Sequence, residues 1–166
     1  MKFILTFMLS SMIISTAFAE DKAYVTSRSM TSETANTLAI SSLRACQKLG
    51  YQVSAAVVDR SGTLLAFIRD PLAGNHSISV ATRKAYTAAT FQTSTITMMQ
   101  RKSFDALRDA DKVLLIGGGV PVKIGGHFYG AIGISGAPAK KITGDVDHAC
   151  AEKGIEAIRE IIEFSE

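Results

Sequence analysis

One side of a predicted helix carries residue types that can bind a ligand. Successive spacings of four, three, four and four residues place on that side His76, Val80, Arg83, Thr87 and Phe91. An imidazole can ligate a metal centre, a guanidinium can pair with an acid group, and two apolar side chains can contact an apolar ligand. Lys84 lies next to this side and adds a second cation. The same spacing also fits a polar stripe that faces solvent or a subunit interface, so the pattern alone leaves all three interpretations open.

The other residues that could do chemistry form no catalytic or metal-binding pattern. His127 opens a predicted strand, and His148 lies in the first turn of a predicted helix, close to Asp145. A zinc site built on His148 and Asp145 is conceivable, but isolated histidines this far apart in sequence are more often structural or solvated. Ser135 lies in the string GISGA, which lacks the GxSxG spacing of a nucleophile elbow. We therefore assign no catalytic residue and no metal ligand.

Helices and β-hairpins alternate along the chain that must position these side chains. Apolar residues at helical spacing predict helices, the third of them less regular, over residues 35–49, 75–91, 93–107 and 143–162. The predicted core face of the second helix consists of Ile78, Ala81, Ala85 and Ala88. β-rich runs at 53–58 and 64–68 predict a hairpin, and residues 24–28 could form a short edge strand. Two hairpins separated by a helical block favour an antiparallel sheet of about five strands with helices packed against it.

A glycine-rich string, GGGVPVKIGGHFYGAIG, occupies residues 117–133. Gly125 and Gly126 separate two β-type runs and predict a tight two-residue hairpin turn. The triple glycine before them lets the backbone bend sharply or approach another group closely, because no Cβ is in the way. No GK[ST] sequence follows it, so the string is not a phosphate-binding loop.

The first nineteen residues have the pattern of a secretory signal peptide. Lys2 precedes a largely apolar segment, and the string AFA at 17–19 fits a small-x-small cleavage site. The apolar segment is too short for a membrane anchor, so we expect no membrane insertion after cleavage, and a periplasmic or secreted domain over residues 20–166. The net charge is only +3 and its basic residues are scattered, which argues against nucleic-acid binding.

The two cysteines lie in the first and last predicted helices after the signal peptide. If these helices lie side by side, Cys46 and Cys150 could form a disulfide in an oxidising compartment. Two buried free thiols are the alternative, and we favour them because the sequence cannot supply the Cα separation that a disulfide needs.

Four motifs in order resemble the GlcG/HbpS family of small haem-binding-associated proteins. They are VSAAVVDRSGTLLAFIRD, RKAYTAATF, GGGVPVKIGGHFYGAIGISGA and TGDVDHACAEKGIEAI. The resemblance spans residues 31–162 and implies an α+β fold, a profilin-like five-stranded antiparallel sheet flanked by helices. It also implies dimers that build larger homo-oligomers. Some members of the family are secreted and bind haem.

The resemblance implies that the ligand of the helical stripe is haem. Haem needs an apolar slot, an axial donor and usually cations for its propionates. We therefore predict that the cofactor-binding residues are His76, Arg83, Lys84, Thr87 and Phe91. The expected function is a secreted haem- or tetrapyrrole-binding protein that sequesters or senses its ligand. The alternatives are an oligomeric accessory protein for a sensor or envelope partner, and a small-molecule enzyme of unknown reaction.

Overall fold

Four strands form one antiparallel sheet with the order β2-β1-β4-β3. In this computed structural model, which describes residues 23–165, β1 (Ser54–Val58) lies between β2 (Leu64–Arg69) and β4 (His127–Ser135). The remaining strand, β3 (Gly119–Ile124), pairs with the other side of β4. Both predicted hairpins are confirmed. The second hairpin turns at Gly125 and Gly126, whose φ angles are 55° and 78°. Glycine adopts such positive φ angles more readily than other residues do.

The predicted fifth strand at residues 24–28 is wrong. Among the described residues this segment pairs with no strand, and the side chains of Tyr24 and Val25 are 65% and 94% exposed. A strand is stabilised mainly by the side chains that it packs against its neighbours. This segment buries no apolar face, so it lacks the side-chain packing that would stabilise it as a strand.

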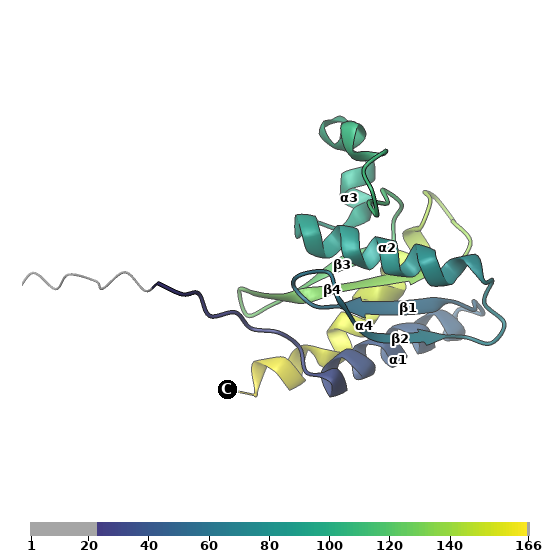
Figure 1. Ribbon diagram of the computed structural model, residues 1–166. Helices are drawn as coiled ribbons and strands as arrows, with labels where there is room; N and C mark the ends of the chain where they lie inside the picture. The colour runs from purple at the N-terminus through teal and green to yellow at the C-terminus, as the bar shows by residue number, and fades with distance from the viewer. Residues whose placement is uncertain (1–22, 166) are drawn as a thin grey trace, which may run out of the picture.

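Helices cover both faces of the sheet (Figure 1). α1 (Ser32–Lys48) and α4 (Asp145–Glu163) lie side by side on one face, and α2 (His76–Phe91) covers the other. The main core fills the space between the sheet and the α1–α4 pair, and a second core lies under α2. Thr31 caps the start of α1, since its side chain accepts a hydrogen bond from the N–H of Thr34.

Small residues let α2 lie unusually close to β4. A Cβ at Gly133 would be only 2.0 Å from the carbonyl oxygen of Ala81. Ala81, Ala85 and Ala88 on the facing side of α2 are fully buried, as predicted. Their small side chains leave room for the close approach of α2 to the strand. Ile78 is 38% exposed, so its predicted place in the core face is wrong.

A disulfide joins α1 to α4, so the expectation of two free thiols is wrong. Cys46 and Cys150 have Cα atoms 5.5 Å apart, which is within the range that a disulfide requires. The two helices pack together along their lengths and bring residues 104 positions apart into contact. That proximity is a tertiary property.

The predicted helical stretch at 93–107 divides into two short elements. α3 (Thr95–Met99) and the 3-10 helix η1 (Lys102–Leu107) form an arm that projects beyond α2 in Figure 1. Three buried residues, Met98, Val113 and Leu115, form its own small core. The predicted signal peptide lies outside the described residues, and no helix within residues 23–165 is long and apolar enough to cross a membrane.

Candidate functional site

A pocket of about 270 Å³ lies where α2, the loop after β4 and the start of α4 meet. Most of its lining comes from small residues of the loop, and the side chains that can bind or exclude are His76, Val80, Lys84, Ile116 and Asp147. Two of these, His76 and Lys84, belong to the stripe predicted from the sequence. The volume is slightly below the usual range for small-molecule pockets. A larger flat ligand could therefore enter it only by one edge.

His76 stands at the rim of this pocket, on the first turn of α2. Its side chain is exposed, and its ring lies over Gly74, where a Cβ would be 2.7 Å from Cε1 and 2.8 Å from Nδ1. Glycine at position 74 thus leaves the imidazole room to lie against the loop. An exposed imidazole beside a partly apolar pocket is available to an incoming ligand.

Lys84 and Asp147 form a buried ion pair at the base of the pocket. The Lys84 Nζ donates to Asp147 Oδ2 at 2.8 Å and to the carbonyl oxygen of Ile134 at 2.9 Å. The other carboxylate oxygen, Oδ1, accepts from the N–H of Ala137 at 3.0 Å. Burial lowers the pKa of Lys84 and raises the pKa of Asp147, because a medium of low polarity disfavours both charges. The sequence predicted that the Lys84 ammonium would pair with an acid group of the ligand. In the structure this ammonium is already paired with the Asp147 carboxylate.

The triple glycine accounts for how the ion pair fits between α2 and α4. A Cβ at Gly118 would lie 2.9 Å from the Lys84 Nζ and 2.8 Å from the Asp147 Cβ. A Cβ at Gly119 would lie 2.4 Å from the carbonyl oxygen of Lys84. The close approach predicted for this string is therefore to α2 and to the buried ion pair.

Asp145 holds the loop that forms the outer wall of the pocket. Its carboxylate accepts hydrogen bonds from the backbone N–H groups of Lys140 at 3.0 Å, Lys141 at 2.7 Å and Val146 at 2.8 Å. These hydrogen bonds, with that of Lys140 first, lower the pKa of Asp145 from 3.8 to about 2. The loop conformation thus depends on an ionised Asp145.

Acid should remove this contribution of Asp145 in a defined pH window. The folded state binds fewer protons at Asp145 than the unfolded state between its unfolded pKa of 3.8 and its folded pKa of about 2. Its contribution to stability is therefore complete above pH 4 and declines as the pH falls toward 2. We expect Asp145→Asn to lower the urea midpoint at pH 6 and to show a smaller further decline on acidification than the wild type. Parallel curves for the variant and the wild type from pH 6 to pH 2 would contradict this role, and Asp109→Asn is the control for loss of an exposed carboxylate.

The other stripe residues lie away from the pocket. Arg83 is exposed, and its Nη2 donates to the carbonyl oxygen of Val113 at 2.9 Å. Thr87 is fully buried, where its Oγ1 accepts from the N–H of Leu114 at 2.9 Å. Phe91 is half-buried in the arm, with its ring edge-on to Phe104. The structure therefore brings His76 and Lys84 together and places Arg83 two helical turns beyond His76.

Asp147 is the site residue that the sequence analysis missed. No local pattern marks it, because its partner Lys84 is 63 residues away in sequence. The Nε2 of His148 lies 3.4 Å from a carboxylate oxygen of Glu152, and within residues 23–165 no three His, Cys, Asp or Glu side chains gather as a metal site. His127 is exposed at the β3–β4 turn.

Comparison with known protein families gives the chain its family. The model of the family described as haem degrading protein HbpS-like matches residues 30–156, which include every element of the fold up to the middle of α4. The chain belongs to this family. A search of curated protein sequences gave no match.

Solved structures of this HbpS-like family and related proteins share the fold. A crystal structure of HbpS and one of a Streptomyces reticuli HbpS double mutant are each 33% identical to this chain, with a TM-score of 0.75. The alignments cover 85% of this chain and 98% and 94% of those chains. A structure of a PduOC:haem complex is 26% identical, with a TM-score of 0.68, and covers 78% of this chain and 95% of that chain. These similarities confirm the predicted family and its α+β fold, with four strands rather than five.

Proposed function

We propose that this HbpS-like protein binds haem, or a related tetrapyrrole, outside the cytoplasm and sequesters or senses it. The observation that carries the proposal is the exposed imidazole of His76 at the rim of a partly apolar pocket in an HbpS-like fold. A relative that shares this fold has been solved as a haem complex. The chain thus belongs to a haem-related family and has a side chain that can donate a nitrogen to the haem iron.

The residues around His76 fit the edge of a tetrapyrrole. His76 would supply the axial nitrogen, and Val80 and Ile116 would contact the apolar edge. Arg83 lies exposed on the same side of α2 and would pair with a propionate, in place of Lys84, which Asp147 already engages. Thr87 and Phe91 would stabilise this side of α2 through their contacts with Leu114 and Phe104, without touching the ligand. The bound iron would supply the ligand's characteristic absorption.

The disulfide supports the proposed location outside the cytoplasm. Disulfides form and persist in oxidising compartments such as the periplasm and are rare in the cytosol. The Cys46–Cys150 bond therefore agrees with the signal peptide predicted at residues 1–19.

A hemin titration followed in the Soret region tests the proposed function. We expect the purified protein to give a saturable change, and His76→Ala to weaken the affinity by about tenfold or more, because an axial bond is lost. The matched control is His127→Ala, which removes another exposed histidine at the β3–β4 turn and should leave the titration unchanged.

Two results would overturn parts of this proposal separately. Saturable binding that is equal in the wild type and in His76→Ala would remove His76 as the axial donor. A flat or non-saturable response of the wild type would contradict haem binding and favour an accessory role with a protein partner.

A further inference from the structure

A second pocket, of about 520 Å³, lies where the β1–β2 turn, the start of β4 and the segment before α1 meet. Arg28, Arg60 and Phe128 are among the residues that line it. It lies at the opposite end of β4 from the His76 pocket, which is lined by Ser135. No aspartate or glutamate within residues 23–165 lines this second pocket, so its charge is positive and suits an anion.

The turn that carries Arg60 is fixed by its contacts with β4 and by its own hydrogen bonds. A Cβ at Gly130, whose φ is 135°, would clash with the carbonyl oxygen of Val58, so glycine at this position lets the turn lie against β4. The Asp59 Oδ1 accepts a hydrogen bond from the N–H of Ser61 at 2.8 Å. The carboxylate next to Arg60 in sequence thus serves the turn, and Arg60 projects from a backbone of defined shape.

Phe128 orients the guanidinium group of Arg60. The Arg60 Nη1 donates to the carbonyl oxygen of Phe128, and Cζ lies 5.1 Å from the centroid of the Phe128 ring. This hydrogen bond uses one of the five N–H groups of a guanidinium. Arg60 is exposed and forms no ion pair with any residue of 23–165. Its remaining donors can therefore form two parallel hydrogen bonds to the oxygens of a phosphate or carboxylate group.

Arg28 brings a second positive charge to the pocket from the other side of β4. Its Nη1 lies 3.5 Å from the Tyr129 Oη. Phe128 and Tyr129 are consecutive residues of a strand, so their side chains point to opposite faces of the sheet, where they belong to different cores. Arg60 and Arg28 thus reach the start of β4 from its two faces and border one pocket. Two cations attract a doubly charged anion more strongly than a singly charged one.

From this geometry we propose that the pocket binds a phosphate group, as free phosphate or on a small phosphate monoester. A phosphate monoester carries nearly two negative charges at neutral pH, whereas a carboxylate carries one. Arg60 would hold the phosphate oxygens, and Arg28 would add the second positive charge. The volume lies within the usual range for small-molecule pockets, so the rest of an ester also has room. Because the pocket is at the other end of β4, its ligand would leave the His76 pocket open.

Calorimetric titrations with inorganic phosphate and with glycerol phosphate, at constant ionic strength, test this proposal. We expect saturable binding by the wild type, and Arg60→Gln should raise the dissociation constant about tenfold or more, because the charged hydrogen bonds are lost. Arg60→Lys keeps the charge without the planar fork and should weaken binding less. Tighter binding of glycerol phosphate would identify a phosphate ester as the ligand class, and equal binding would identify free phosphate.

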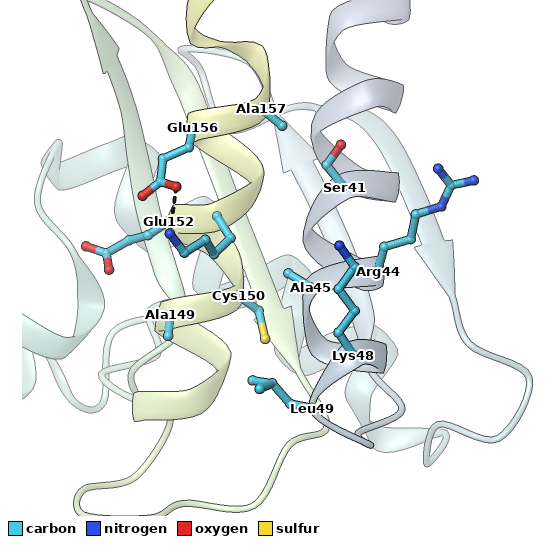
Figure 2. Close-up of a pocket in the computed structure, with 11 residues that line it drawn as sticks. Ser41, Arg44, Ala45, Lys48, Leu49, Ala149, Cys150, Glu152, Glu156 and Ala157 are labelled. Carbon is cyan, nitrogen blue, oxygen red and sulfur yellow. Dashed lines mark hydrogen bonds and ion pairs between the residues drawn. The ribbon is translucent and has the colours of Figure 1, made fainter.

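The matched control is Arg44→Gln, which removes the same charge elsewhere. Figure 2 shows Arg44 directed outward from α1, and it lies more than three turns into that helix, whereas Arg28 precedes it. This control should bind phosphate as the wild type does. Equal losses in Arg44→Gln and Arg60→Gln would show a general charge effect and overturn the proposal. So would wild-type protein that binds neither probe saturably at millimolar concentrations, or an Arg60→Gln variant, folded by circular dichroism, with unchanged affinity.

Discussion

Replacing both cysteines by alanine is expected to lower the free energy of unfolding by about 4–5 kcal/mol. The Cys46–Cys150 bond spans 104 positions, and a cross-link of that span removes much of the conformational freedom of the unfolded chain. Native domains are stable by only about 5–15 kcal/mol, so this loss is a large share of the total. Urea unfolding of the double variant and the wild type measures it.

The denaturant slope gives this prediction an internal check. An unfolded chain without the cross-link exposes more surface, so the m-value of the double variant should rise. Both cysteine side chains are buried, so a reductant reaches the disulfide only when the protein unfolds. Wild-type protein that is unfolded and refolded in a reductant should therefore have the same free energy of unfolding as the double variant. Equal urea midpoints for the oxidised and reduced proteins would contradict a stabilising disulfide.

The buried ion pair gives the second large effect. Asp147→Ala leaves the Lys84 ammonium without its carboxylate in a site where Lys84 is 1% exposed, and we expect a loss of about 3–5 kcal/mol. Lys84→Met leaves the Asp147 carboxylate unpaired and should cost a similar amount. Thermal or urea unfolding at pH 7 measures both losses.

A double variant separates the ion pair from its surroundings. Lys84→Met combined with Asp147→Leu removes both charges and should cost less than the sum of the single changes. The remaining cost would include the N–H of Ala137, which loses its acceptor on Asp147. Additive losses, or single losses below about 1 kcal/mol, would be inconsistent with a coupled buried pair.

Local sequence signals predicted the elements whose ends are marked by particular residues. Gly50 follows α1 with a φ of 83°, and Gly125 and Gly126 turn the β3–β4 hairpin. The segment at 24–28 has no such constraint, and whether it pairs depends on contacts with the rest of the chain. Ile78 has helical spacing with the buried alanines but is 38% exposed, whereas Gly133 of β4 lies against Ala81 and Ala85.

The candidate site was predictable only where neighbours on one helix define it. His76 and Lys84 share a pocket because both lie on α2, and helical spacing can show this. The state of Lys84 could not be predicted, since its partner Asp147 comes from α4 on the opposite face of the sheet. Thr87 belongs to the same stripe, yet its hydroxyl is used by the N–H of Leu114 in a loop. Spacing identifies the side of a helix, whereas tertiary contacts determine which of its groups are free.

The disulfide between the first and last helices also makes most of the chain a closed loop. Any single peptide bond cut between Cys46 and Cys150 leaves both pieces in one covalent molecule. The projecting arm lies inside this loop and has exposed basic side chains at Arg101, Lys102 and Arg108, which are natural sites for trypsin-like proteases. A cut there would open the arm without releasing α1 from α4, and the two fragments would stay together in one covalent molecule.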